Sequence, residues 1–349
     1  MERNRVTLVA VILATIGALS AIDLFLARTE NRETRAEAEN NYQSGVRLLA
    51  ANRAEDAVDA LRKAYALDRS DPRFALRLAA ALLASGKLDE AQSMLGEILQ
   101  ASPNNGEANL LEARLEVRQE KFAEAAPYYH RAIYGIWSED EGARRVEVRL
   151  ELADFLASRG SDKELLAELL PLETEAHDLA TRRRVAHLYL VANSPARAAA
   201  AYRALIHDDP KDRSDYAGLG EAELALGDYR SAQVAFQNTG AADRAALAAE
   251  MWGLDPTLRR LSAAEKLSRS NRILQSVRDA LTKCAADDPL LKDADELLSK
   301  KIRTATNELA EERLALAEQM WDARAARCGT SSLPVEESLK LIMAKLSGK

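Results

Sequence analysis

The sequence predicts an all-α fold in which helical hairpins stack one upon another. Three observations indicate this. Small residues recur 34 positions apart, larger residues recur between them at the same spacing, and no segment alternates with the period of two that marks a strand. The small residues form two series, Gly45, Ala79 and Ala113, and Ala57, Ala91 and Ala125; the larger ones are Leu61, Leu95 and Tyr129.

The spacing returns in the middle of the chain, where Ala186 and Gly220, Ala198 and Ala232, and Tyr202 and Phe236 are each 34 apart. Small side chains let the two helices of a hairpin approach closely, and the larger residue fills the space between hairpins. Gly86, Gly160 and Gly227 are predicted to end first helices in a left-handed conformation. Pro72, Pro103 and Pro210 fall between hairpins, where a missing backbone donor is tolerated.

This pattern resembles the tetratricopeptide repeat, whose signature is Trp-x2-Leu-Gly-x2-Tyr, then Ala-x3-Phe, then Pro. One copy here reads Arg182-x2-Val185-Ala186-x2-Tyr189, Ala198-x3-Tyr202, Pro210. Six copies are expected, at roughly 38–71, 72–105, 106–139, 146–178, 179–212 and 213–246. The resemblance implies a right-handed tetratricopeptide-type solenoid.

Two copies depart from the pattern. The third has Glu112 and Glu116 where apolar residues are expected, and the fourth has Leu165 in place of the second-helix Ala and then Pro171. The spacing also lengthens between these copies, and the extra residues are assigned to a loop within 135–142.

The expected domains are a signal anchor or transmembrane helix at 1–27, a charged juxtamembrane stalk at 28–40, about six repeats at 41–246, and a helical carboxy-terminal domain at 247–349. The apolar segment from Val6 to Ala27 is long enough to span a membrane once. Two other interpretations remain, a cleaved signal peptide and a buried soluble helix. Arg3 and Arg5 favour an inside amino terminus, which places the solenoid outside the cytoplasm, whereas Arg28, Arg32 and Arg35 oppose that orientation.

The carboxy-terminal third belongs to no family that its residues identify. Apolar residues at steps of three and four predict two long antiparallel helices, the second unbroken from Pro289 to about Arg327, and then a short helix after Pro334. An unbroken helix would hold Cys284 and Cys328 too far apart to bond. A disulfide between them would mean that the helix folds back on itself.

The composition argues against several classes of function. The formal net charge of −7 argues against nucleic acid as a partner. The sequence has no phosphate-binding loop, no dinucleotide fingerprint and no zinc-binding motif, and its four histidines are scattered. We therefore expect no catalytic residue, no cofactor and no metal.

The resemblance implies a partner-binding groove lined by the first helix of each repeat. Carried onto this chain, its candidate residues are Tyr42, Arg73, Arg77, Arg114, Arg118, Arg183, Arg184 and His187. Leu76, Leu110 and Leu150 would supply apolar contacts, and Glu151, Asp154 and Glu221 acidic ones. The arginines suggest an acidic or carboxylate-ended peptide, because guanidinium binds carboxylate in two-pronged fashion. Alternatively, they are solvated or pair with glutamates along the same helix.

The first functional hypothesis is a non-catalytic, membrane-anchored interaction scaffold at a bacterial-type membrane, whose groove binds peptide or helical segments of other proteins. The alternative is a periplasmic chaperone or assembly factor that signal cleavage releases. A third hypothesis is an accessory subunit of an enzyme or a divergent transferase, which the sheetless, motif-free carboxy-terminal third disfavours.

Overall fold

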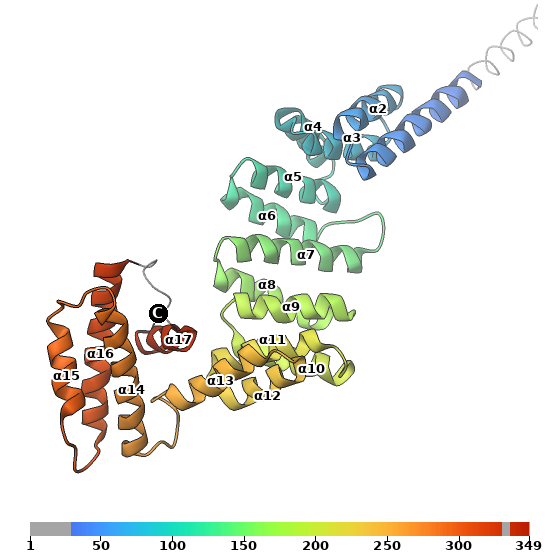
Figure 1. The fold of residues 1–349 in the computed structure, drawn as a ribbon. Helices are drawn as coiled ribbons and strands as arrows, with labels where there is room; N and C mark the ends of the chain where they lie inside the picture. The colour runs from blue at the N-terminus through green and yellow to red at the C-terminus, as the bar shows by residue number, and fades with distance from the viewer. Residues whose placement is uncertain (1–28, 330–335, 349) are drawn as a thin grey trace, which may run out of the picture. The chain divides into compact units, whose positions relative to one another are not determined.

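The computed structural model describes residues 29–329 and 336–348 (Figure 1). These residues divide into two compact units, with the boundary between Phe155 and Leu156. Within the described ranges every regular element is a helix, and one isolated bridge joins Asn105 to Ile136. The apolar segment expected at 1–27 lies outside the described residues. Among the helices that are described, none is both long enough and apolar enough to cross a membrane.

The first unit consists of helical pairs, as predicted. Its first helix covers 29–50 without interruption, so the residues expected to form a stalk continue directly into the first repeat. The following helices are α2 (Ala54–Leu67), α3 (Pro72–Ala84), α4 (Leu88–Ala101), α5 (Gly106–Arg118), α6 (Phe122–Ile133) and α7 (Glu141–Ser158), whose last turn passes the unit boundary.

The two helices of each pair contact each other at small residues. A Cβ atom added to Gly45 would lie 2.4 Å from Leu61 of α2, so the first helix and α2 approach too closely for any side chain at this position. Ala57, Ala91 and Ala125 on the second helices are fully buried. These positions are the ones the 34-residue spacing singled out, and this expectation is confirmed.

The turns inside the pairs share one conformation. The second residue before each second helix has a positive φ, whether it is glycine or not; the six residues are Asn52, Gly86, Glu120, Gly160, Asn193 and Gly227. The three predicted glycine turns are therefore confirmed. The other three positions hold L-residues that accept the same left-handed conformation, at a modest cost for Asn and a larger one for Glu120.

The inserted loop between the third and fourth pairs spans 134–140, close to its predicted place. It folds back on the start of α5. The Ile136 amide donates to the Asn104 carbonyl at 2.7 Å, and the Gly106 amide donates to the Ile136 carbonyl at 2.9 Å. Trp137 lies against Gly106, where a Cβ would be 2.4 Å from the indole. Tyr134 and Ile136 remain about two-thirds exposed, at 69% and 67%.

The second unit continues the pairing and then changes arrangement. Its paired helices are α8 (Asp162–Glu175), α9 (Leu179–Val191), α10 (Pro195–Asp208), α11 (Arg213–Leu226) and α12 (Tyr229–Thr239). The remaining helices are α13 (Ala242–Leu254), α14 (Ala263–Thr282), α15 (Leu290–Ser299), α16 (Asn307–Cys328) and α17 (Glu337–Leu346). Tyr229 shares one apolar core with residues of α13, α14, α16 and α17, so the last repeat and the carboxy-terminal helices form a single folded body.

The predicted long antiparallel hairpin is wrong. The second helix breaks at residues 300–306, so that α15 ends at Ser299 and α16 begins at Asn307 (Figure 1). The chain turns twice, and α16 runs parallel to α14: Asn271 contacts Arg313, and Cys284 lies beside Cys328 with a Cα–Cα distance of 5.9 Å. The two cysteines form a disulfide, which the expected unbroken helix would have prevented.

Capping and a buried arginine explain the break. The Thr306 hydroxyl accepts a hydrogen bond from the Leu309 amide and starts α16. Arg313 is fully buried and donates to the carbonyls of Leu297 at the end of α15 and of Leu309, at 3.1 and 2.8 Å, and to the Asn271 side chain. The apolar steps at Ile302, Ala305 and Leu309 concealed this break because they keep a helical spacing across it.

Candidate functional site

The candidate groove residues of the first unit lie on its first helices, beginning with Tyr42 and Arg73. The Arg73 guanidinium lies 5.3 Å from the centre of the Tyr42 ring. Arg73 also forms ion pairs with Asp71 at 2.6 Å and with Glu39 of the preceding first helix at 3.1 Å. On the same helix, Arg77 pairs with Glu107 of α5.

Arg114 and Arg118 occupy successive turns of α5. Arg114 binds Glu151 of α7 in two-pronged fashion, from Nε at 2.8 Å and from the terminal nitrogen at 2.7 Å, and the Tyr129 hydroxyl donates to the same carboxylate at 3.0 Å. The hydrogen bond to Glu151 raises the pKa of Arg114. Arg118 donates to the Leu83 carbonyl at the end of α3. Glu151, predicted as a free acidic contact, is therefore already the partner of Arg114.

In the second unit, Arg183, Arg184 and His187 lie on α9. Arg183 is partly buried and binds Asp215 of α11 in two-pronged fashion at 2.8 and 3.1 Å, with Asp212 at 2.8 Å from its terminal nitrogen. Asp215 is almost wholly buried. Arg184 and His187 are exposed on the same helix.

These contacts form a repeating ladder, in which consecutive first helices of one unit are joined by an arginine and a carboxylate. The pairs are Glu39–Arg73, Arg77–Glu107 and Arg114–Glu151 in the first unit and Arg183–Asp215 in the second, where Glu221–Arg244 continues the series from α11 to α13. One alternative from the sequence was that the arginines pair with glutamates along the same helix, whereas these partners come from a neighbouring helix. Half-exposed pairs of this kind add about 0–1 kcal/mol each. Their main consequence is that a carboxylate balances the charge of each paired arginine on the first-helix face.

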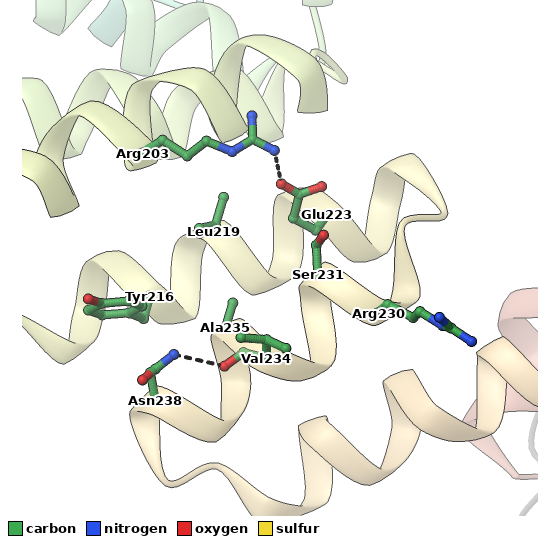
Figure 2. Close-up of a pocket in the computed structure, with 9 residues that line it drawn as sticks. All are labelled: Arg203, Tyr216, Leu219, Glu223, Arg230, Ser231, Val234, Ala235 and Asn238. Carbon is green, nitrogen blue, oxygen red and sulfur yellow. Dashed lines mark hydrogen bonds and ion pairs between the residues drawn. The ribbon is translucent and has the colours of Figure 1, made fainter.

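The second helices of the second unit border two clefts that sequence reasoning missed. One, of about 380 Å³, lies among α10, α11 and α12 (Figure 2). Its apolar part comes from Tyr216, Leu219 and Val234, and the ion pair between Arg203 and the buried Glu223 closes one end. Figure 2 shows Arg230 pointing away from these residues; its guanidinium lies 4.2 Å from the centre of the Trp252 ring.

The other cleft, of about 340 Å³, lies among α8, α9 and α10. Its polar residues form a connected group, in which Tyr189 donates to Glu173 at 2.5 Å and Arg197 pairs with the same carboxylate at 2.8 Å. Burial raises the pKa of Tyr189 above its ordinary value, which keeps its hydroxyl protonated as a donor. The sequence offered a signal for both clefts, because Val185, Tyr189 and Leu219 are repeat-signature positions flanked by second helices rich in small residues.

A buried carboxylate pair distinguishes α5. Glu112 and Glu116, one turn apart, are 5% and 6% exposed, and one oxygen of each has no hydrogen-bond partner. Burial, followed by the charge of Glu116, raises the pKa of Glu112 to about 7, while Lys121 and Arg131 act in the opposite direction. Within the described residues, no group of three histidine, cysteine, aspartate or glutamate side chains is arranged to hold a metal ion.

The paired helices, the small residues that close them and the ladder along their first helices define a helical-repeat protein. A family model described as the cytochrome c-type biogenesis protein H TPR domain matches residues 28–143, about a third of the chain. That match and the repeat geometry of both units identify the chain as a tetratricopeptide-repeat protein.

Several solved structures are similar to it. The C-terminal part of a repeat protein of this type from Cytophaga hutchinsonii is 12% identical, with 86% of this chain and 98% of that chain covered and a TM-score of 0.45. A tetratricopeptide-repeat protein from Parabacteroides merdae is 15% identical, with 81% and 99% covered and a TM-score of 0.41. No curated protein matches the sequence.

Proposed function

We propose that this protein is a non-catalytic scaffold, which holds segments of other proteins on the first-helix face of its repeats. The observation that carries the proposal is the ladder of arginine–carboxylate pairs between consecutive first helices. The pairs fix the spacing of the first helices while leaving side chains such as His187 and Arg184 exposed between them. A face whose first helices are joined by paired charges suits a peptide or helix bound through apolar contacts and hydrogen bonds.

The finer proposal concerns the process that the scaffold serves. The family model matching the first repeats is described by cytochrome c-type biogenesis. We propose that this chain acts in the assembly of c-type cytochromes, by holding a polypeptide while another component works on it. A face built from paired helices that are joined by side-chain ion pairs suits such a holding role.

The cellular location of the repeats is a separate proposal. We propose that the apolar segment at 1–27 tethers the chain to the membrane and that the repeats lie outside the cytoplasm. The disulfide between Cys284 and Cys328 supports this location, because disulfides persist in oxidising compartments and are rare in the cytosol. The alternative, a periplasmic chaperone released by cleavage after the same segment, is equally compatible with the disulfide.

Affinity capture from salt-washed membranes tests the scaffold. We expect the protein to remain in the washed membranes and to recover a defined set of proteins, including components of cytochrome c assembly. Replacing Arg77, Arg114 and Arg118 together by alanine should reduce that recovery, because the first helices lose their alignment.

The control replaces three cations at second helices, Arg53, Arg62 and Lys87, whose ion pairs are local or join neighbouring second helices. Circular dichroism must show that both variants stay helical. Recovery lost equally in both variants would argue against the first-helix face, and protein found only in the wash would favour the released chaperone.

A further inference from the structure

The carboxy-terminal helix α17 contacts the surface where the sequence placed the groove of the second unit. Arg244 of α13 binds Glu221 of α11, one of the predicted groove residues, and also Glu337 at the start of α17, at 2.8 Å. An open cleft of about 430 Å³ lies beside α17 and is lined by residues of α11, α12, α13 and α17. Helix α17 is thus bound at the edge of the first-helix face.

The contacts of α17 are those of an amphipathic helix in a groove. One stripe, Leu339, Ile342 and Met343, is buried against the core that α13, α14 and α16 share. The spacing of three and four residues between these side chains is the usual recognition pattern of a helix that binds in a groove. Leu341, on the open side, is 37% exposed and lines the cleft.

A single lysine anchors the other end of α17. Lys345 Nζ lies 2.6 Å from the carboxylate of Asp255, which is completely buried. The Tyr229 hydroxyl donates to the same oxygen at 2.8 Å, and Thr257 donates to the other oxygen from its amide and its hydroxyl, each at 2.7 Å. These groups form a prepared acceptor for one cation, and they belong to α12, to the end of α13 and to the turn that follows it.

Helix α17 is one of the shortest described helices of the second unit. It has ten residues, shorter than an isolated helix needs for stability in water. The hydroxyl of Ser338 is buried without a hydrogen-bond partner, which opposes docking. The disulfide at Cys328 fixes the end of α16 independently of α17.

We propose that α17 is an intramolecular ligand of the second unit, and that a partner's amphipathic helix replaces it. The replacing helix would carry an apolar stripe spaced like Leu339, Ile342 and Met343 and a lysine or arginine that reaches Asp255. Partner binding at this site is then regulated by competition with the chain's own terminus. The inference rests on the proposed scaffold function only for the existence of the partner; the displacement of α17 is measured without it.

Binding of a labelled peptide with the sequence of residues 336–348 tests the inference on the full chain. Wild-type protein should bind it weakly, because the tethered α17 competes at a high effective concentration. A variant with Ile342→Asp and Lys345→Ala, whose own helix docks poorly, should bind the peptide at least about tenfold more tightly. A peptide carrying Lys345→Glu should lose that binding, and so should the variant with Asp255→Asn added.

Hydrogen exchange on the wild-type protein gives the second measurement, which does not depend on how the variants fold. Amides of α17 should exchange much faster than those of α14 and α16, because α17 leaves its site without global unfolding. Equal protection of the three helices, or no peptide binding by a folded variant, would overturn the proposal. A failed search for partners would contradict the scaffold function and leave this result unchanged.

Discussion

At the scale of single residues, two buried carboxylates depart furthest from the repeat pattern. Glu112 and Glu116 occupy positions in α5 where the repeat pattern asks for apolar side chains, and both are buried with an unpartnered oxygen. An ionised carboxylate in such a place is costly unless it is paired. Lys121 Nζ lies 3.8 Å from the Glu116 carboxylate, too far for a hydrogen bond. Glu112 therefore gains a proton more readily in the folded protein than in the unfolded chain.

Replacing Glu112 by Gln should stabilise the first unit at pH 8 and leave it unchanged near pH 4. The folded pKa, about 7, lies above the ordinary value of 4.5, so the folded state binds more protons between these values and loses stability as pH rises through them. The gain at pH 8 should be on the order of 2–3 kcal/mol. Thermal unfolding at both pH values measures it.

The exposed Glu124 of α6 offers the matched control. Its replacement by Gln should give the same small change in melting temperature at both pH values. A Glu112→Gln variant whose stability follows wild type across this pH range would show that Glu112 is ionised and satisfied in the folded protein.

The sequence predicted which residues would be small, buried or charged, but not which charges would meet. Glycine and alanine at the repeat spacing identify the contact between paired helices because only they fit there. The partner of an arginine such as Arg114 depends on how far the next first helix is displaced, here 37 residues along the chain to Glu151. The inserted loop sets that displacement. The number of its residues can be counted in the sequence, but the path of its backbone cannot be predicted from it. The candidate groove residues remain predictions, since their partner is unidentified.

At the scale of elements, the fold-back of α15 and α16 departs most from what the sequence suggested. The pattern of apolar residues describes each helix correctly, yet it crosses the break at 300–306 without a change of period. The two cysteines offered a test of that pattern, because a bond between them requires α16 to return towards the end of α14. Their disulfide and the buried Arg313 together hold the three helices in this order.

Removal of the disulfide should therefore destabilise the second unit. A variant with Cys284→Ser and Cys328→Ser should lose about 2–4 kcal/mol in free energy of unfolding, because the bond closes a long loop in the unfolded chain. Urea denaturation followed by circular dichroism measures this loss. A reducing agent should lower the stability of wild-type protein to the same value and leave the variant unaffected. Two free thiols in the unreduced, unfolded wild-type protein would contradict this arrangement.

At the scale of the whole molecule, each unit is held together by contacts between neighbours. Pairs of helices close on small residues, and first helices are joined by the arginine ladder. The all-α class and the helical pairs followed from the sequence because they depend on these local contacts. The carboxy-terminal body did not, because its order depends on one cap, one buried arginine and one disulfide. A face along the first helices exists only if the two helices of every pair approach each other in the same way.

The pairing of α11 and α12 tests that requirement most directly. A Cβ at Gly220 would lie 2.5 Å from the ring of the buried Phe236, whereas at Gly253 of the same unit the nearest atom is 3.6 Å away. Gly220→Ala should thus lower the free energy of unfolding by about 1–2 kcal/mol despite the higher helix propensity of alanine. Gly253→Ala should leave it unchanged or raise it by up to about 1 kcal/mol. Chemical denaturation of the two variants beside wild type measures both; a Gly220→Ala protein as stable as the Gly253→Ala protein would contradict the close pairing of helices on which the proposed binding face depends.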